Sequence, residues 1–499
     1  MVEALNLRLD TMQQSLAKNT TLLTAAFAFQ KILSFFYFTA IARSIGEENL
    51  GKYGFALTFT SIFVIFMDFG LGPILTREGA KDERTLGENL RRIVALKLFL
   101  TFFSLIALVL TLWIYHEIKP VPVDTRLLTY LAIGIIIFDT FTFTFFSIFR
   151  ARQRLQYEAL GIMIYQALIV TAGLFVIYSH LPLYALILAI LLGSMFQFTY
   201  SLLLVKWKAK LSVWPHFDFG TFKKFIFLGA PFALAGIFFK LNGSIDTVML
   251  HGLAGERYVG WYLVALKLTT ALTVLPGAFA TGFFPAMSHY YQHAREKMAT
   301  LFEHSMFYLM VISLPITFGV LVIADRIILT VYGPAFEASI QALQIFISSL
   351  LFVFLNYPVG NLLNAADKQM RNTVHMGIAL FVNIILNIML IPKYTYIGAS
   401  FAALATHIVL ILLGLPVVYR IVRFRVRYLI DKLLRVFTAA SIMGVCLFVI
   451  EPYFSFSFGL IFLIFVGAFV YAIALFLVRA FSFDELRFLY SIALRKKAV

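Results

Sequence analysis

Six charged side chains inside long apolar runs of this 499-residue sequence could bind an anion or a cation. The bases are Lys31, Lys240 and Lys267, and the acids are Asp68, Asp139 and Asp246. Ammonium groups bind anions as point charges, and carboxylates can hold a proton or a cation. A lysine at the centre of a bilayer costs about 2.5–3.5 kcal/mol on insertion scales. We therefore expect these lysines to face a water-filled cavity or carboxylates rather than lipid.

Structural pairing is the alternative to a binding role. Asp246 follows Lys240 by six residues, too far round a helix for a direct pair. Asp68 or Asp139 could instead pair with a lysine of another helix. Asp68 and Asp246 lie near the ends of apolar runs and are expected to satisfy neighbouring groups, so Asp139 is the better intramembrane carboxylate. Lys97 lies near the inner end of its run and is expected to snorkel to the cytoplasmic surface.

Composition identifies the solvent around these charges. Hydrophobic residues make up 61% of the chain, charged residues 13%, and mean hydropathy is +0.90. Soluble domains are about 45–50% apolar and about a quarter charged. We therefore expect an all-α polytopic membrane protein. The single cysteine, Cys446, lies in an apolar run and excludes an intrachain disulfide and a cysteine-based metal site.

Fourteen apolar segments are predicted to be membrane spans, of which 436–451 is the shortest. The predicted spans are 19–43, 52–76, 93–115, 127–149, 157–179, 182–205, 225–250, 259–286, 304–324, 339–364, 372–392, 396–419, 436–451 and 457–479. The expected organisation is a cytoplasmic amphipathic segment (1–18), a first lobe of six helices (19–205), a basic cytoplasmic linker (206–224), a second lobe of six helices (225–419), and two further helices with a basic tail (420–499).

The basic residues orient these spans. Cytoplasmic loops of membrane proteins carry an excess of lysine and arginine. With the N-terminus inside, thirty of the 41 basic residues fall in inner segments and seven in outer ones. Both termini are therefore predicted to be cytoplasmic, and the net charge of +16 reflects topology and attraction to anionic lipid. Nucleic-acid binding would need a basic patch on a folded soluble domain, and no soluble segment here exceeds about 25 residues.

A short stretch of sequence occurs twice, 209 residues apart. GEENLGKYGFAL at 46–57 and GERYVGWYLVAL at 255–266 agree at six of twelve positions. Each copy is the outer turn between an odd and an even span, and the same offset places Lys31 on Lys240. Six spans separate the copies, so the two repeats should run parallel and be related by a pseudo-twofold axis along the membrane normal, with a site between them.

Other polar residues favour packing over chemistry. Asparagines and a histidine in spans 10 to 12 are expected to form interhelical hydrogen bonds; they are Asn356, Asn361, Asn364, Asn383, Asn387 and His407. The sequence has no HExxH, GxxxxGK[ST] or GxSxG motif in a plausible context, and no loop could house a catalytic domain. We therefore predict neither an enzyme nor a metal site.

Three stretches resemble one family of transporters over nearly the whole chain. FTAIARSIGEENLGKYGFALTFTSIFVIFMDFGLGPILTREGA resembles the opening helices of bacterial and archaeal polysaccharide-biosynthesis transporters. SIDTVMLHGLAGERYVGWYLVALKLTTALTVLPGAFATGFFPAMSHYY resembles their seventh and eighth helices, and VNIILNIMLIPKYTYIGASFAALATH their eleventh and twelfth. The family is similar to O-antigen and exopolysaccharide flippases, within the superfamily that also holds the lipid II flippase and the multidrug and toxic compound extrusion transporters.

The resemblance implies a fold and a function. The fold would be two six-helix lobes in a V around a central cavity, with two extra C-terminal helices. The function would be alternating-access transport of a polyprenyl-pyrophosphate oligosaccharide to the outer leaflet of the inner (plasma) membrane, for surface polysaccharide synthesis. Membrane lipids and other polysaccharide-assembly proteins would be partners. No cofactor is expected beyond a coupling ion, H⁺ or Na⁺.

The charged residues acquire roles from this resemblance. Lys31, Lys240 and Lys267 would neutralise the pyrophosphate in the cavity. Asp68, Asp139 and Asp246 would couple an ion or balance charge. Related flippases often use arginine at such places, and this chain has three lysines. A lipid II flippase stays open as an alternative. A multidrug exporter is disfavoured because it would need carboxylates, and a membrane glycosyltransferase would need a larger outer loop.

Overall fold

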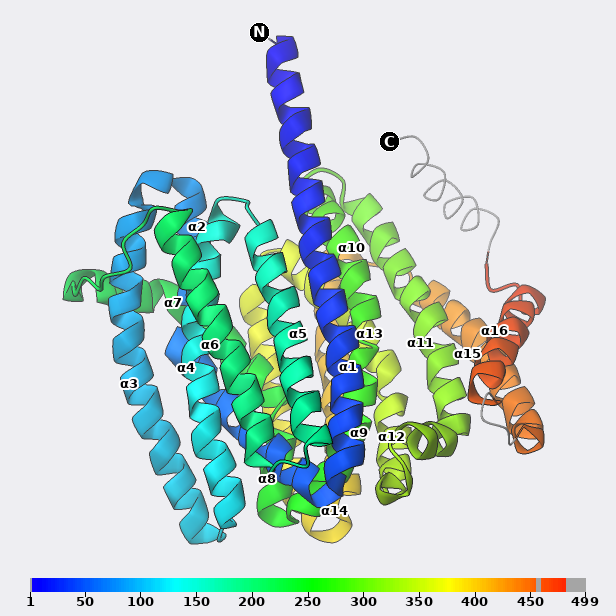
Figure 1. The fold of residues 1–499 in the computed structure, drawn as a ribbon. Coiled ribbons are helices and arrows are strands. Elements are labelled where there is room, and N and C mark those ends of the chain that lie inside the picture. Colours follow the sequence, from blue (N-terminus) through cyan, green and yellow to red (C-terminus); the bar gives the residue numbers. More distant parts are fainter. Residues whose placement is uncertain (1, 455–458, 482–499) are drawn as a thin grey trace. The chain divides into compact units, whose positions relative to one another are not determined.

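Helices form every regular element in the part of the chain that the structure describes (Figure 1). The computed structural model describes residues 2–454 and 459–481, and side chains from residue 21 onward except at 281 and 292. By residue contacts it divides into two compact units, Met1–Leu263 with Asn387–Tyr396, and Val264–Leu386 with Ile397–Val499. We describe each unit by itself.

The first unit contains the helices of the N-terminal half. Their bounds are α1 (Val2–Asp68), α2 (Leu71–Lys81), the 3₁₀ turn η1 (Glu83–Thr85), α3 (Leu86–Ile118), α4 (Val123–Ala151), α5 (Gln156–Tyr178), α6 (Tyr184–Trp207), α7 (Phe219–Asn242), α8 (Ile245–Leu253) and the first residues of α9 (Glu256–Ala271). A short piece of α14, Asn387–Tyr396, also belongs to this unit.

The second unit contains the remaining helices. Their bounds are α10 (Val274–His293), α11 (Arg295–Val331), η2 (Pro334–Phe336), α12 (Ser339–Ser348), α13 (Leu350–Ala365), α14 (Gln369–Val422), α15 (Val426–Ile450), η3 (Glu451–Tyr453) and α16 (Gly459–Leu477). The rest of α9 joins them.

Twelve helices in the described range are long and apolar enough to cross a membrane. Two of them contain a sharp break where the sequence predicts a turn between spans. The first break is at Gly46 in α1, with φ 75° and ψ 175°, and the second is at Thr395 in α14, with φ 50° and ψ −127°. The all-helical membrane fold is therefore confirmed, and twelve helices with two such breaks are compatible with fourteen spans.

A stripe of large side chains on α1 builds part of the first unit's core. Apolar residues recur at every fourth position of the helix, so they share one face. This cluster comprises Phe55, Phe59, Phe63 and Met67 of α1, Leu108 and Leu112 of α3, and Ile136 of α4. A second cluster joins α2, α3, α4 and the start of α7. These contacts fix α1, α3 and α4 around the charged residues described below.

The two C-terminal helices are attached to α11 in the second unit. The Tyr471 hydroxyl of α16 donates a hydrogen bond to the Val311 carbonyl, at 2.8 Å. Arg326, near the C-terminal end of α11, forms an ion pair with Glu451 after the end of α15. One apolar cluster runs through α11, α13, α15 and α16. Both C-terminal helices are therefore integral to the second unit's core.

Some expectations stay predictions. Residues 2–20 continue α1 as helix, but their side chains lie outside what the structure describes, so an interfacial segment at 1–18 is untested. Of the basic C-terminal tail, residues 482–499 lie outside the described residues. The boundaries of two six-helix lobes also stay predictions, because the compact units group residues by contact and not by repeat.

Candidate functional site

The two copies of the repeated turn begin with a glycine in a left-handed backbone conformation. Gly46 has φ 75° and Gly255 has φ 113°. Residues other than glycine rarely adopt such backbone angles, which explains why both copies begin with glycine. Each glycine precedes a helical segment, the second half of α1 in one case and α9 in the other. The repeat therefore encodes the same local turn twice.

The two turns also pack against each other, inside the first unit. A Cβ atom placed on Gly51 would lie 1.8 Å from the carbonyl oxygen of Glu256. A Cβ atom on Gly260 would lie 1.9 Å from the carbonyl oxygen of Glu47. Gly51 and Gly260 are equivalent in the repeat, and so are Glu47 and Glu256. The contact is therefore reciprocal, as expected of two repeats that meet across a pseudo-twofold axis.

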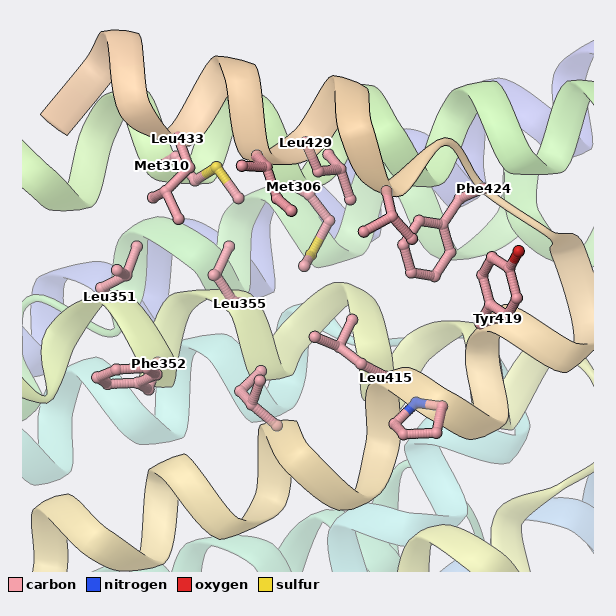
Figure 2. A pocket seen from close by; sticks show the side chains of 14 residues that line it. Met306, Met310, Leu351, Phe352, Leu355, Leu415, Tyr419, Phe424, Leu429 and Leu433 are labelled. Carbon is pink, nitrogen blue, oxygen red and sulfur yellow. The ribbon is translucent and has the colours of Figure 1, made fainter.

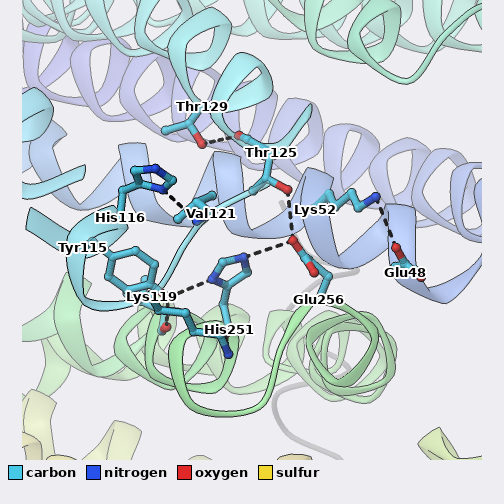
Figure 3. A network of polar contacts seen from close by, with 11 residues as sticks. Glu48, Lys52, Tyr115, His116, Lys119, Val121, Thr125, Thr129, His251 and Glu256 are labelled. Atoms are coloured by element: carbon cyan, nitrogen blue, oxygen red, sulfur yellow. Dashed lines mark hydrogen bonds and ion pairs between the residues drawn. The ribbon is translucent and has the colours of Figure 1, made fainter. Parts of the chain in front are cut away.

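A polar network surrounds the second copy of the turn (Figure 3). The Thr125 hydroxyl of α4 donates to Glu256 Oε1 at 3.2 Å, and His251 Nε2 lies 3.6 Å from the same oxygen. The other ring nitrogen of His251, Nδ1, lies 2.8 Å from the hydroxyl of Tyr115 on α3. Lys119 Nζ donates to the His251 carbonyl at 3.3 Å. The network thus links α3, α4, α8 and α9.

His251 is also packed by an aromatic ring. Its imidazole stacks on Phe55 of α1 with ring centroids 3.7 Å apart, and the residue is 2% exposed. A buried imidazole with a carboxylate on one side and a phenol on the other is oriented by both partners. The turn at Glu256 is therefore anchored to three helices of the N-terminal half by side chains.

Asp246 is buried next to this network and accepts hydrogen bonds from neutral donors. The Tyr262 hydroxyl lies 3.0 Å from Oδ2, and Asn387 Nδ2 lies 2.6 Å from Oδ1. These bonds attach the α14 piece Asn387–Tyr396 to α8 and α9 within the first unit. Asp246 therefore satisfies neighbouring groups, which is the structural role that its position near a span end favours.

Asp68 and Lys97 form a buried ion pair, which corrects one expectation. Lys97 Nζ lies 2.6 Å from Asp68 Oδ1 and 2.6 Å from the Thr144 hydroxyl. The Lys97 residue is 0% exposed. The prediction that Lys97 snorkels to the membrane surface is therefore wrong. Depth along the helix allowed snorkelling, but the rotation of α3 directs the side chain toward α1 and α4.

Asp139 lies in α4 beside polar groups of two other helices. Its neighbours include Ser194 of α6 and Tyr165 of α5. Asp139 Oδ1 is buried and has no hydrogen-bond partner among the residues that the structure describes. A carboxylate oxygen in this situation can accept a proton or a donor from a ligand at little structural cost. Asp139 thus differs from Asp68, which has a lysine partner.

The three predicted lysines lie in three different helices. Lys31 in α1 is exposed, and Lys240 in α7 is partly buried. Neither has a hydrogen bond or ion pair with another described residue in the first unit. Lys267 in α9 is partly buried and belongs to the second unit. The structure therefore gives Lys31 and Lys240 no structural pairing, whereas a site shared by all three lysines stays a prediction.

Three of the five asparagines of spans 10 to 12, Asn356, Asn383 and Asn387, form interhelical hydrogen bonds as predicted, whereas for Asn361 and Asn364 the expectation stays a prediction. In the second unit, Asn383 Nδ2 donates to the Thr406 hydroxyl at 3.0 Å, and Asn356 Nδ2 donates to the His407 carbonyl at 3.3 Å. No group of three or more metal-binding side chains occurs within the searched, described residues.

Comparison with known proteins identifies the family. The family model described as "Polysaccharide biosynthesis protein" matches residues 16–291, more than half of the chain. The chain belongs to this family. A second model, MatE, matches residues 231–389.

Two curated relatives match most of the chain. The "Probable low-salt glycan biosynthesis flippase Agl15" of Haloferax volcanii is 22% identical over 392 residues, which cover 78% of this chain and 80% of that protein. The "Capsular polysaccharide biosynthesis protein CapF" of Staphylococcus aureus is 21% identical over 396 residues, covering 77% and 94% respectively.

Solved structures share the fold. The lipid II flippase MurJ in an inward closed conformation has a TM-score of 0.71 at 18% identity, and the match covers 91% of this chain and 98% of that one. An inward-facing transporter of the multidrug resistance MATE family has a TM-score of 0.65 at 15% identity, covering 79% and 95%. At identities this low, the two matches show a shared fold and no more.

For this member of the polysaccharide biosynthesis protein family, sequence reasoning missed the network around His251. Tyr115 and Thr125 lie more than 100 residues before His251, and no short motif joins them. One signal was available, because Glu256 is the repeat equivalent of Glu47 and is flanked by the other repeated residues. A repeated acidic residue beside a buried histidine in the same turn indicates a structural polar contact.

Proposed function

We propose that this member of the polysaccharide biosynthesis protein family is a flippase. Its substrate would be an oligosaccharide linked through pyrophosphate to a polyprenyl lipid, moved from the cytoplasmic to the outer leaflet of the plasma membrane for surface polysaccharide synthesis. Family membership and the names of the relatives support transport rather than catalysis. The observation that carries the proposal is that Lys31 and Lys240 are repeat equivalents within helices of a membrane protein, and neither has a charged or hydrogen-bonding partner among the described residues.

The need to carry a charged pyrophosphate through the membrane explains the intramembrane lysines. A pyrophosphate carries about two negative charges, and a low-dielectric region without countercharges would oppose its passage. Ammonium groups neutralise phosphate as strongly hydrated point charges without fixing its orientation. Lys31, Lys240 and Lys267 would therefore hold the pyrophosphate loosely enough for release. The sugars would occupy an aqueous cavity, and the polyprenyl chain would stay in lipid.

Alternating access is the proposed mechanism, with the two repeats exposing the lysines to one leaflet at a time. Other polysaccharide-assembly proteins would supply the substrate and accept the product. Among the carboxylates, Asp139 is the proposed coupling site for H⁺ or Na⁺, because its Oδ1 has no hydrogen-bond partner among the described residues, whereas Asp68 is neutralised by Lys97. Asp246 accepts from Tyr262 and Asn387 and would balance charge rather than couple an ion.

A lipid II flippase is the second candidate, favoured by the fold shared with MurJ. Both substrates contain a polyprenyl pyrophosphate, so the lysines would serve either. A multidrug exporter of the same superfamily is the weaker candidate, because three intramembrane lysines repel cationic drugs.

Transport by reconstituted protein tests the proposal. Vesicles would contain the full chain and a polyprenyl-pyrophosphate oligosaccharide, and exposure of the sugar to an external lectin would report its flipping. We expect Lys240→Ala and Lys267→Ala to insert normally but to lower the initial rate at least about tenfold, because one unneutralised charge in low dielectric costs well over about 1.4 kcal/mol. Lys→Arg variants at the same positions should retain transport.

The control is Lys52→Ala, which removes a lysine of α1 that is already paired with Glu48 at 3.2 Å. Its rate should match that of the unmodified protein. Undiminished transport by the Lys31/Lys240/Lys267 triple alanine variant would refute the role of the lysines. Running the assay with and without imposed H⁺ and Na⁺ gradients tests Asp139, since indifference to both gradients would exclude ion coupling there.

A further inference from the structure

An apolar groove lies between α11, α13, α14 and α15 in the second unit (Figure 2). Its volume is about 420 Å³, within the range of about 300–1,000 Å³ that is usual for ligand sites. Met306, Met310, Leu355, Leu415 and Leu429 are among its lining residues, and Tyr419 supplies the one polar side-chain group of the lining. Such a surface suits a hydrocarbon chain, and one hydroxyl is too little to bind a sugar.

The groove ends beside a cluster of arginines. Figure 2 shows Tyr419 and Phe424 together at one end of the lining, where α14 joins α15. Four exposed arginines lie around that connection: Arg420 in the last turn of α14, Arg423 and Arg425 in the connection itself, and Arg427 in the first turn of α15. The charge distribution of the whole sequence predicts that this end faces the cytoplasm.

Three of these arginines are available to an anion. Arg425 is engaged, because its guanidinium lies 2.6 Å from Glu303 of α11 and its backbone N–H donates to the same carboxylate at 2.6 Å. Arg420, Arg423 and Arg427 have no acidic partner among the residues that the structure describes. The ion pair of Arg425 fixes the α14–α15 connection beside α11, and so keeps the other arginines next to the mouth of the groove.

We propose that this groove binds an anionic membrane phospholipid. One acyl chain would lie in the groove against Met306, Met310 and Leu429, and the phosphate would contact Arg420, Arg423 and Arg427. Arginine binds phosphate through parallel hydrogen bonds, and basic pockets between membrane helices are typical sites for anionic headgroups. Tyr419 lies between the apolar groove and the arginines, at the level where aromatic side chains prefer to lie in a membrane.

The position of the arginines favours a resident phospholipid over the transported lipid as the occupant of the groove. A pyrophosphate on its way through the membrane needs charges within the spans, and under the proposed function Lys31, Lys240 and Lys267 supply them from other helices. The arginines of the groove lie at the end of α14, in the α14–α15 connection and at the start of α15, where the charge distribution predicts the cytoplasmic headgroup region. The bound lipid would join α15 to α11, α13 and α14, so occupancy should stabilise the second unit. This inference does not depend on which glycan the protein carries.

Photolabelling tests the site. The full chain would be placed in phosphatidylcholine nanodiscs with a trace of phosphatidylglycerol that carries a photoreactive group on one acyl chain. We expect labelled peptides to come mainly from the groove segments of α11, α13 and α15. Unlabelled phosphatidylglycerol should compete, and added phosphatidylcholine should not. Equal labelling of all lipid-facing helices, or equal labelling by a phosphatidylcholine probe, would overturn the proposal.

Charge variants separate a built site from general attraction. The Arg420→Gln/Arg423→Gln/Arg427→Gln variant should lower the preference for phosphatidylglycerol over phosphatidylcholine by about tenfold or more, since each basic group near an anionic headgroup contributes on the order of fivefold. The matched control is Lys206→Gln/Lys208→Gln/Lys210→Gln, which removes the same charge from exposed lysines at the end of α6. It should change groove labelling less than about twofold. An equal loss in both variants would refute the site.

Two further measurements decide the occupant. Leu415→Trp narrows the groove and leaves the arginines intact, so it should abolish groove labelling while retaining weak binding of the headgroup. A polyprenyl phosphate added as competitor should displace the probe less well than phosphatidylglycerol does. Stronger displacement by the polyprenyl phosphate would assign the groove to the transported lipid and overturn the proposal.

Discussion

Three intramembrane carboxylates of the first unit, Asp68, Asp139 and Asp246, have different neighbours. Asp68 accepts from the ammonium of Lys97, whereas Asp246 accepts from a tyrosine hydroxyl and an asparagine amide. Asp139 lies beside Ser194 and Tyr165. A buried ion pair contributes little net stability, but breaking one partner of it is costly, because the remaining charge is stranded. The pair of Asp68 and Lys97 is therefore expected to be structural.

This role predicts the stability of variants at Lys97. Lys97→Met leaves the Asp68 carboxylate buried without its cation, and should lower the free energy of unfolding by about 3–5 kcal/mol. The Asp68→Asn/Lys97→Met double variant strands no charge and should recover most of this loss. Thermal or denaturant unfolding of the purified protein in detergent measures both.

The matched control for this prediction is Lys81→Met, at an exposed lysine that lies 3.1 Å from Glu78. A surface pair contributes about 0–1 kcal/mol, so this variant should be nearly neutral. A double variant as unstable as the Lys97→Met single variant would contradict the charge argument and indicate lost packing instead.

The repeated turn brings two helical segments into close backbone contact. Gly51 and Gly260 allow the second half of α1 and the start of α9 to approach at backbone distance. Because the contacted atoms are backbone carbonyls, a methyl group at either position cannot be accommodated by moving a side chain. The helices themselves must separate.

Gly51→Ala and Gly260→Ala should therefore have similar effects. Each should lower the free energy of unfolding by roughly 1–3 kcal/mol through overpacking. Each should also increase hydrogen exchange at the start of α9. The control is Gly277→Ala in α10, where a Cβ atom would meet nothing within 4 Å. There, alanine should be neutral or stabilising by up to about 1 kcal/mol. Markedly different effects of the two repeat glycines would contradict a reciprocal contact.

These elements also show what the sequence can predict. Apolar length predicted the long helices that the structure contains, and a glycine in each repeat marked a turn that the structure also contains. The pairing of Lys97 could not be predicted, because apolar length gives depth along a helix but not its rotation toward neighbours. The network of His251 with Tyr115 and Thr125 depends on contacts between helices far apart in sequence, which no local pattern specifies.

At the scale of the whole molecule, charge distribution is the strongest constraint on function. A flippase must present its site to opposite leaflets, so its orientation in the membrane decides which side loads the substrate. Thirty of the 41 basic residues fall in predicted inner segments, and the helix breaks at Gly46 and Thr395 lie at predicted outer turns. An odd error in the number of spans would reverse the orientation of everything after it.

This orientation can be measured with single cysteines. Cys446 is the one cysteine of the chain, so Cys446→Ser gives a cysteine-free background. On it, Glu48→Cys places a thiol in the first repeat turn, and Lys208→Cys places one after α6; both positions are exposed. A membrane-impermeant maleimide added to intact cells should label Glu48→Cys. It should label Lys208→Cys only after the membrane is opened, because lysine-rich loops are retained in the cytoplasm. Labelling of Lys208→Cys in intact cells would reverse the predicted orientation, and with it the direction of transport proposed here.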